Sequence, residues 1–503
     1  MSGDRIGQSG FIGLSGAAVR GVATGLFVAL AMLALFWGRM ANHDIAWFLI
    51  ATRKWLDGAT LYVDLVEVNP PLNFYLTLPS LLLADIFGTS DTNGQYVAVA
   101  LLCFGSIVWC SAILQSAYDF SPATQALLLL GIGAAVTLPS LNGVGQREQV
   151  MVLCFLPWAL REASSDGGST GQQIRSAAFA AVGMCLKPYF AVLPLSITLL
   201  NCLQTRSLRP VLSPANLVFL VIGLAYVFLV RAVHPAYFSQ IVDYGLEVYG
   251  AYGKPAPELV AEIGVALAPV MVFIAVSVRT QVASRPVAVF IGLSLSGLVS
   301  YFLQAAGFSY HKVPFFAFGM IACLLVLVQS KRHWASSLAA MVAAFTLVGA
   351  GLYQGFYKNA AIPEITETMA KFGPIDGVIT LSSHVYNGPP VAIALKTHWA
   401  SSYPANWLVP GAFNRLDHLD CAAERQLCEK LNGIAARNRS DTISDITKSR
   451  PDLIIVDRRS GYFDKPNFDW LGFMAADPGW ARVFADYAHV ATSNRYLYYK
   501  RQP

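Results

Sequence analysis

Apolar residues dominate this chain in long runs that short polar connections separate. The first run, Ala17 to Trp37, is about long enough to cross a bilayer as a helix and has no small-residue cleavage site after it, so we interpret it as a retained span rather than a signal peptide. The further runs of spanning or nearly spanning length are Tyr96 to Leu114, Ala123 to Leu138, Val150 to Leu160, Ser176 to Leu186, Phe190 to Leu203, Leu217 to Val230, Leu259 to Val278, Val287 to Leu303, Phe315 to Val328 and Ala335 to Leu352. The pattern predicts a polytopic α-helical membrane protein with about 11 transmembrane helices.

Basic residues fall mainly in alternate connections between these runs. With the N-terminus in the cytoplasm, the inner connections hold Arg161, Arg175, Arg206, Arg209, Arg279, Arg285, Lys331 and Arg332. This distribution satisfies the positive-inside rule. The same threading places residues 41–95, 143–149, 186–190, 234–258 and 307–314 on the outer face. Arg147, Lys187 and Lys312 are therefore basic residues on the outer side, where topology does not explain them.

One further apolar stretch, Pro71 to Phe87, does not fit this alternation. If it crossed the bilayer fully, every later connection would change sides and the arginine-rich loops would face outward. We therefore expect a re-entrant or interfacial helix on the outer side, preceded by an amphipathic surface helix that begins near Asp44. Residues 41–95 would form the first outer loop of a membrane domain that covers residues 1–356.

The chain becomes richer in charge after the last apolar run. The segments "GVITLSS" (Gly377 to Ser383) and "PDLIIVDRR" (Pro451 to Arg459) are typical of short buried strands. An odd number of spans would place residues 357–503 outside, as a soluble α/β domain. The sequence leaves open whether Cys421 and Cys428 form a disulfide there. It also leaves open whether the aromatic residues of Lys396 to Phe413 bind sugars or pack onto the membrane domain.

The composition agrees with a membrane protein. Hydrophobic residues make up 55% of the 503 residues and charged residues only 13%. The net charge of +5 is small for this length and no dense basic run occurs, which disfavours nucleic acid as a partner. The sequence has no Walker A loop, no Gly-x-Gly-x-x-Gly after a strand, no Gly-x-Ser-x-Gly elbow and no metal-spaced Cys/His set. Nucleotide hydrolysis and soluble-type binding of a nucleotide sugar are therefore disfavoured.

Polar residues gather at the outer ends of several separate segments. They are Asp44, Glu67, Asn69, Gln146, Arg147, Glu148, Lys187, His311 and Lys312. Ionisable groups at membrane depth are costly and usually mark a site or a route for a ligand. Since these segments all end on one face, we expect a shared cavity.

The residue types suggest which chemistry this cavity supports. Arg147, Lys187 and Lys312 offer charge-assisted bonds to a phosphate, although each of them could instead reach lipid headgroups. Asp44, with no dedicated partner in sight, could accept a proton from a hydroxyl, although the dipole of its helix would also favour an acid there. A sugar donor linked to a lipid phosphate and attacked by an acceptor hydroxyl needs both kinds of group.

The acidic residue after the first span and the stretch "DGATLYVDLVEVNPPL" before a lipid-hugging helix resemble the integral-membrane glycosyltransferases of the C-type (GT-C) fold. The chain is most similar to bacterial relatives of the dolichyl-phosphate-mannose protein mannosyltransferases and of the lipid A aminoarabinose and galacturonic acid transferases. The catalytic aspartate of that family matches Asp44, but its usual Asp-Glu pair is Asp44-Ile45 here. Glu148 in "GQREQ" matches an acidic position of the family, and "LKPYF" and "GFSYHKVP" look like its outer-face Lys-Pro and Tyr-His segments.

The resemblance implies an inverting hexosyl- or pentosyltransferase of the bacterial inner membrane, with the N-terminus in the cytoplasm and the C-terminal domain in the periplasm. Its donor would be a polyprenyl-phosphate-linked sugar and its acceptor a hydroxyl of an envelope glycan, lipid or protein. No metal ligand is assigned, and a divalent-cation requirement stays open.

Within that interpretation, each candidate residue has an expected role. Asp44 would be the general base, and the donor phosphate would bind Arg147, Lys187 and Lys312. Sugar or acceptor would be positioned by Glu67, Asn69, Glu148 and His311, and the loop with Tyr249 and Tyr252 could cover the site. Two alternatives remain: a transporter or flippase, for which the sequence shows no internal repeat, and an inactive scaffold, which the missing second carboxylate keeps open.

Overall fold

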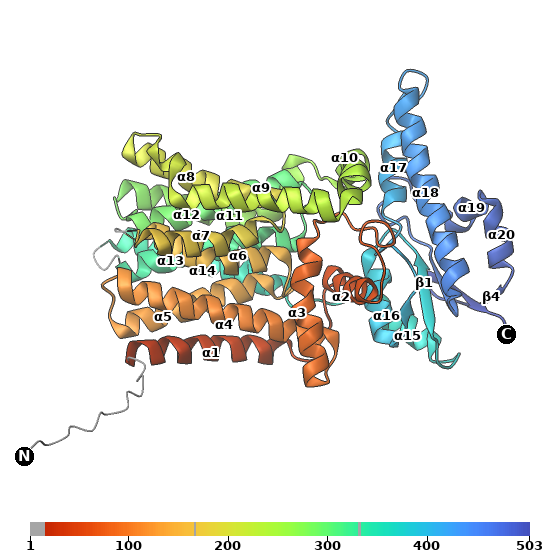
Figure 1. Ribbon diagram of the computed structural model, residues 1–503, viewed down its shortest axis with the longest axis horizontal. Helices are drawn as coiled ribbons and strands as arrows, with labels where there is room; N and C mark the ends of the chain where they lie inside the picture. The colour runs from red at the N-terminus through yellow and green to blue at the C-terminus, as the bar shows by residue number, and fades with distance from the viewer. Residues whose placement is uncertain (1–15, 165–166, 330–332) are drawn as a thin grey trace, which may run out of the picture.

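The computed structural model describes residues 16–164, 167–329 and 333–503 and shows a helical bundle joined end-on to a C-terminal unit with a β-sheet (Figure 1). The bundle helices run along the long axis of the molecule. They are α1 (Gly16–Phe36), α4 (Asp91–Ala117), α5 (Pro122–Thr137), α6 (Arg147–Ala163), α7 (Thr170–Met184), α8 (Val192–Thr205), α9 (Pro214–Val233), α11 (Ala256–Arg279), α12 (Arg285–Gln304), α13 (Val313–Gln329) and α14 (Trp334–Gln354).

Each apolar run of the sequence coincides with one bundle helix. In the described part of the chain, 8 helices are long and apolar enough to cross a membrane. The helices α6, α7 and α8 are shorter, at 17, 15 and 14 residues. The prediction of a mostly helical protein with many candidate spans is confirmed, whereas the number of 11 stays a prediction.

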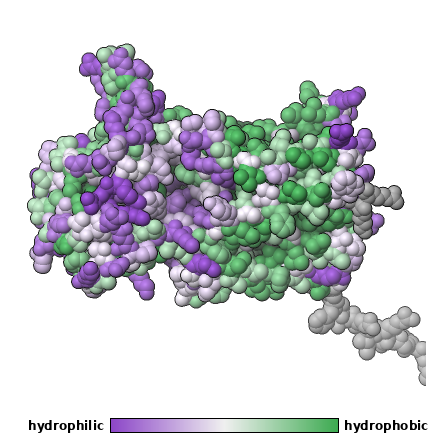
Figure 2. Space-filling model, turned by 180° about the vertical axis from the view of Figure 1, so that it is seen from behind, coloured by the Kyte–Doolittle hydropathy of each residue, from purple (hydrophilic) through white to green (hydrophobic). Residues whose placement is uncertain are grey.

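The helix α6 forms the centre of the bundle. It packs against α4, α7, α12 and α13, and almost all of its residues are buried. The outer faces of the bundle instead expose large apolar side chains, such as Leu195, Phe228, Val265 and Phe345. Figure 2 shows this as a hydrophobic surface over the bundle beside a hydrophilic C-terminal unit. An apolar outer band of this kind suits contact with lipid.

Two short helices, α2 (His43–Leu56) and α3 (Leu72–Phe87), lie at the bundle end that faces the C-terminal unit, and α3 runs across the bundle axis (Figure 1). The side chain of Asn42 caps α2 by accepting a hydrogen bond from the backbone N–H of Asp44 at 3.1 Å. Arg53 ties α2 to its neighbours through ion pairs with Asp85 (2.7 Å) and Asp91 (2.6 Å). The depth of α3 in a membrane stays a prediction.

The C-terminal unit contains a five-stranded sheet in the order β2-β1-β3-β5-β4. The strands are β1 (Gly377–Leu381), β2 (His398–Trp399), β3 (Leu453–Asp457), β4 (Tyr487–Thr492) and β5 (Tyr496–Arg501), and the helices are α15 (Ala361–Met369), α16 (Pro389–Leu395), α17 (Leu408–Leu416), α18 (Arg425–Ser449), α19 (Trp470–Ala475) and α20 (Pro478–Phe484). Strand β1 pairs in parallel with β2 and β3, while β5 is antiparallel to β3 and β4. Every residue of β1 and β3 is buried, so both strands predicted from the sequence are present. Cys421 and Cys428 form a disulfide.

The short helix α10 (Val242–Val248) connects the bundle to the C-terminal unit. It lies between a π-helical turn (Tyr237–Ile241) and a 3-10 turn (Tyr249–Tyr252). Lys430 of α18 pairs with Asp243 at 2.7 Å and with Glu247 at 2.8 Å, and Arg415 of α17 pairs with Glu247 at 2.5 Å. These contacts hold α10 against the C-terminal unit.

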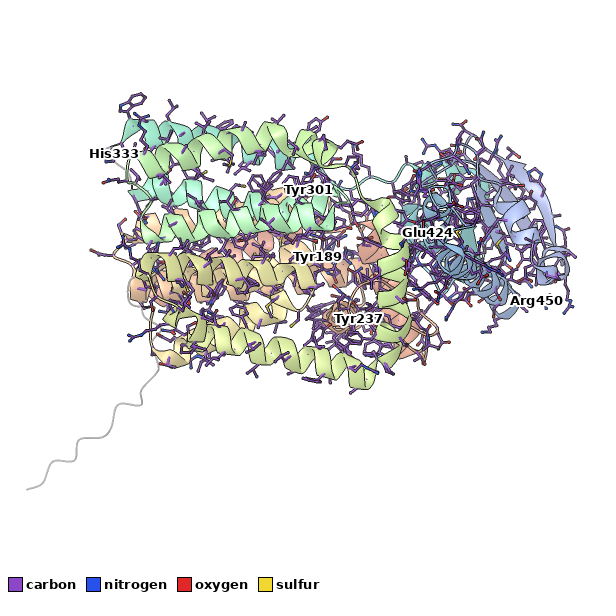
Figure 3. The ribbon with its side chains drawn as sticks, turned by 90° about the horizontal axis from the view of Figure 1, so that it is seen from above. Tyr189, Tyr237, Tyr301, His333, Glu424 and Arg450 are labelled. Atoms are coloured by element: carbon purple, nitrogen blue, oxygen red, sulfur yellow. A yellow bond between two sulfur atoms is a disulfide. The ribbon has the colours of Figure 1, made fainter. Side chains whose placement is uncertain are left out.

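The two ends of the bundle are distinct in Figure 3. Tyr189 and Tyr301 lie toward the end that meets the C-terminal unit, and His333, between α13 and α14, lies at the opposite end. Lys331 and Arg332, which were assigned to an inner connection, are outside the described residues. The side of the membrane on which each end lies therefore stays a prediction.

Candidate functional site

A cavity of about 340 Å³ lies between the bundle end and the C-terminal unit. Of the eight polar residues to which the sequence analysis gave a base, phosphate-binding or sugar- or acceptor-binding role, five line it: Asp44, Glu67, Asn69, Arg147 and Lys187. The remaining lining residues are His43, Trp47, Phe48, Val68, Tyr249, Tyr252, Phe308, Tyr310, Ser383, Val385, Tyr386, Pro404, Trp407 and Tyr462. The expectation that separate outer-end segments share a cavity therefore holds for these five side chains.

Asp44 forms an ion pair with Arg147 in this cavity. Its Oδ2 accepts hydrogen bonds from Arg147 Nη2 at 3.0 Å and from Gln146 Nε2 at 3.2 Å. Burial by itself would raise the pKa of Asp44, but the charges of His43 and Arg147 and hydrogen bonds from Tyr310 and Gln146 hold it below its ordinary value. The sequence-based expectation of an aspartate without a dedicated partner is wrong, because the first turn of α2 passes over the start of α6.

The guanidinium of Arg147 keeps unused hydrogen-bonding capacity. The side chain is 6% exposed, and in the described part of the chain its Nε and Nη1 are buried without a hydrogen-bond partner. The rings of Phe48 and Tyr310 lie 5.5 and 5.6 Å from its Cζ. Unpaired buried donors are costly, and charged ones more so. Because Arg147 lines the cavity, its charge would attract a ligand anion there.

Lys187 lines the cavity, and its ammonium group contacts a polar cluster of Glu148, Gln304 and His311. Its Nζ donates to Glu148 Oε1 and to Gln304 Oε1, both at 2.6 Å, and lies 3.4 Å from His311 Nε2. Burial lowers the pKa of Lys187 to about 8, although the nearby carboxylate of Glu148 opposes that shift. Glu148 and His311 are buried and do not line the cavity. They contact Lys187, so the geometry gives no direct support to their expected contact with sugar or acceptor.

Lys312 is separated from the other two basic residues. Its Nζ lies 3.2 Å from Glu262 Oε2 on α11, and it does not line the cavity. The reason is the 3-10 turn Ser309–Lys312, whose Tyr310 and His311 are buried while Lys312 reaches α11. The expected phosphate contact of Lys312 therefore finds no support in this arrangement.

Glu67 is fixed at both of its carboxylate oxygens. Its Oε2 accepts from Trp47 Nε1 at 2.8 Å, and its Oε1 accepts from the backbone and side-chain N–H groups of Asn69. Burial raises the pKa of Glu67 above its ordinary value. The cavity thus holds two acidic side chains with different partners. Asp44 pairs with a cation, whereas Glu67 accepts hydrogen bonds from neutral donors.

Aromatic side chains supply much of the remaining wall. Tyr249 and Tyr252, named from the sequence as a cover, line the cavity, and Tyr252 donates its hydroxyl hydrogen to the carbonyl of Trp407. Tyr386 and Tyr462 of the C-terminal unit were not identified from the sequence. Trp407 lies in the stretch whose aromatics were noted, but no motif distinguished it from a packing residue. Aromatic walls with a few fixed polar groups are typical of small-molecule sites.

Among the described residues, no group of three or more His, Cys, Asp or Glu side chains is placed to hold a metal ion.

No protein-family model and no curated protein matches the chain. Thirteen chains of solved structures match it. One is the archaeal oligosaccharyltransferase AglB from Archaeoglobus fulgidus in complex with an inhibitory peptide and a dolichol-phosphate, with a TM-score of 0.43 and 10% identity over 96% of this chain and 74% of that chain. Another is an Archaeoglobus fulgidus oligosaccharyltransferase tethered to an acceptor peptide, with a TM-score of 0.41 and 9% identity over 97% of this chain and 74% of that chain. TM-scores below 0.5 are too low to assign a function to this chain, so its function has to be inferred from the cavity.

Proposed function

We propose that this chain is an inverting membrane glycosyltransferase that transfers a hexose or pentose from a polyprenyl-phosphate-linked donor to a hydroxyl of an envelope acceptor. The reaction would take place on the periplasmic face of the bacterial inner membrane. One observation carries the proposal: Asp44 pairs with a buried arginine, Arg147, and both side chains line one cavity. A carboxylate and a guanidinium at the same cavity offer both groups that transfer from a lipid phosphate requires.

In the proposed reaction, Asp44 accepts the proton of the acceptor hydroxyl while that oxygen forms a bond to the anomeric carbon. The bond between this carbon and the phosphate oxygen breaks, and its electron pair stays on the departing polyprenyl phosphate. Arg147 and Lys187 would stabilise that charge by donating hydrogen bonds to it. Attack and departure on opposite faces of the carbon invert its configuration.

Arg147 has the geometry to place base and phosphate relative to one another. Its Nη2 is paired with Asp44, whereas Nε and Nη1 have no hydrogen-bond partner within the described structure. The pairing makes Asp44 a weaker base, but it also keeps the carboxylate ionised at neutral pH. In this proposal, the guanidinium of Arg147 therefore holds the charged base Asp44 in place and also binds the phosphate.

The remaining roles follow from position. Glu67 and Asn69 would bind sugar or acceptor, because both line the cavity. We propose that Glu148 and His311 are positioning residues that hold Lys187, and that Lys312 does not contact the donor. The aromatic residues Tyr249, Trp407 and Tyr462 would pack against the sugar or the acceptor.

Sugar transfer by the purified full chain tests this proposal. The chain in lipid nanodiscs is given a synthetic polyprenyl-phosphate donor with a labelled sugar, together with extracted envelope material as acceptor. We expect Asp44→Asn to reduce transfer by about 10²- to 10⁴-fold, since it removes the base. Asp64→Asn, in the same loop but exposed, is the matched control and should leave transfer unchanged.

Two outcomes would contradict the proposal in different ways. If Asp44→Asn transferred sugar as fast as the wild type, Asp44 would not be the base. If the wild type moved the donor across liposomes without forming a product, the chain would be a flippase.

A further inference from the structure

A second cavity, of about 280 Å³, lies next to the Asp44 cavity. Its polar wall is formed by Arg39, Asn42, Tyr96, Asn142 and Tyr357. Asn42 caps the helix that carries Asp44, and the following residue, His43, already lines the first cavity. The two cavities are therefore neighbours on either side of the start of α2.

Arg39 is held in a fixed orientation at this second cavity. Its Cζ lies 3.7 Å from the ring centroid of Phe356, and its Nε donates to the carbonyl of Leu35 at 2.6 Å. In the described part of the chain, its terminal amino groups have no hydrogen-bond partner, and the side chain is exposed. A guanidinium oriented by an aromatic face and a backbone carbonyl presents its remaining N–H donors at low entropic cost.

The cavity lies where several candidate spans end. Helix α1 ends at Phe36 and α14 at Gln354, while α4 begins at Asp91 and the segment after α5 supplies Asn142. Ends of neighbouring spans that meet at one level mark the boundary between hydrocarbon and headgroups. An arginine at that boundary attracts the phosphates of anionic lipids.

A groove of mixed polarity continues from the same arginine. This hollow, of about 320 Å³, shares Gly38, Arg39 and Met40 with the second cavity. Its other lining residues include polar Ser90, Thr92 and Asn93 and apolar Ile362, Pro390, Ile393 and Ala394. On the bundle side, the segment around Arg39 exposes the apolar side chains of Leu35, Trp37 and Met40. A fixed cation between a polar cavity and these exposed apolar side chains matches a ligand with a phosphate between a polar and an apolar part.

We propose that Arg39 is the centre of a binding site for the phosphate headgroup of an anionic membrane phospholipid, distinct from the Asp44 cavity. The phosphodiester oxygens accept hydrogen bonds from the terminal N–H groups of Arg39. The polar headgroup substituent lies beside Asn42 and Asn142, and the acyl chains return toward the bilayer past the exposed apolar side chains of Leu35 and Trp37. This site does not depend on the proposed sugar transfer.

Native mass spectrometry of the full chain in detergent tests the site. Phosphatidylglycerol, with a net negative charge, is the probe, and zwitterionic phosphatidylcholine, whose choline cation compensates the phosphate, is the comparison. We expect a phosphatidylglycerol adduct that phosphatidylcholine does not give. Arg39→Gln should weaken it about five- to tenfold, and Arg39→Lys should retain part of the affinity. Trp37→Asp, at an exposed position beside Arg39, should also weaken it, while Asp44→Asn should not change it.

A matched control is Arg231→Gln. Arg231, like Arg39, is an exposed arginine near the end of a candidate span, in this case the last turn of α9. It lines neither of these two hollows. The affinity of the Arg231→Gln variant for phosphatidylglycerol should equal that of the wild type. The melting temperatures of all variants are compared to exclude unfolding. Unchanged binding by Arg39→Gln, or equal binding of the two lipids, would overturn the proposal. Displacement by free glycerol phosphate at the same affinity would assign the site to a soluble phosphate and overturn the lipid assignment.

Discussion

Arg147 and Lys187 differ in how much of their charge is available to a ligand. Arg147 gives one amino group to Asp44 and keeps two nitrogen donors unsatisfied within the described structure. Lys187 gives hydrogen bonds to Glu148 and Gln304, so a ligand phosphate must share its ammonium group with them. We therefore expect Arg147 to be the main anion site and Lys187 to be the group whose charge depends on pH.

The donor affinity should fall in alkaline solution because of Lys187. Its pKa, lowered by burial to about 8, means that the side chain is charged below that pH and loses its charge as the pH rises past it. We expect the KM for the polyprenyl-phosphate donor to rise above about pH 8, as the attraction to the phosphate is lost. The measurement is donor KM between about pH 6.5 and 9.5 at constant ionic strength.

Lys187→Arg is the matched variant for this pH dependence. A guanidinium stays charged over the whole range, so the rise in KM should disappear or move to higher pH. Asp44 cannot cause the effect, because its lowered pKa keeps it ionised throughout. A wild-type KM that is flat with pH, or a rise that Lys187→Arg leaves in place, would contradict the assignment.

Five of the eight expected site residues could be located from the sequence because each one follows or precedes an apolar run on the same predicted face. The sequence could not tell which way consecutive residues of a short turn point. Tyr310 faces the cavity, His311 packs behind it on Lys187, and Lys312 reaches Glu262. The directions of these three side chains depend on the backbone of one 3-10 turn and on the position of α11. The periodicity of apolar residues in the sequence shows neither.

At the scale of elements, α10 is the clearest case in which tertiary contacts decide the structure. The sequence indicated an outer loop over residues 234–258 that could cover the site, whereas the structure has a helix held by Lys430 and Arg415 of the C-terminal unit. The bundle helices and the strands β1 and β3 were predictable because each buries a continuous apolar run. A seven-residue helix has no such signal of its own, since partners distant in sequence stabilise it.

Lys430→Ala should loosen α10 without unfolding the protein. The variant removes ion pairs to Asp243 and Glu247 that are partly exposed, so the effect on global stability should be small. Backbone hydrogen exchange in residues 237–252 should become faster, because that segment loses contacts to α18. The donor KM should rise as well, since Tyr249 and Tyr252 line the cavity.

Arg425→Ala provides the control for this experiment. Arg425 also lies on α18 and pairs at 2.7 Å with Glu429, but both side chains are largely exposed and belong to the same helix. Its exchange rates in residues 237–252 should match the wild type. Equal protection of this segment in Lys430→Ala would show that the ion pairs do not hold α10 in place.

At the scale of the whole molecule, the cavity exists only because the two parts of the chain are joined end-on. Lys54 on α2 donates to the carbonyl of Ser401 at 2.8 Å, and the N–H of Val66 donates to the carbonyl of Ser402 at 2.9 Å. These bonds place the segment with Trp407 over the outer loop of the bundle. The sequence predicted a soluble unit and left open whether the aromatic residues of Lys396 to Phe413 pack onto the membrane domain. It could not decide this, because bonds to backbone carbonyls leave no residue pattern.

The membrane orientation stays a prediction, and two exposed residues allow it to be measured directly. His333 and Arg450 are both exposed and lie at opposite ends of the molecule (Figure 3). If the C-terminal unit is periplasmic, Arg450→Cys should react with a membrane-impermeant maleimide in spheroplasts, and His333→Cys should react only after the membrane is opened. The wild type should stay largely unlabelled, because its six free cysteines lie in the bundle and its other two are disulfide-bonded. Labelling of His333→Cys alone in intact spheroplasts would place the Asp44 cavity in the cytoplasm, where a periplasmic acceptor could not reach it.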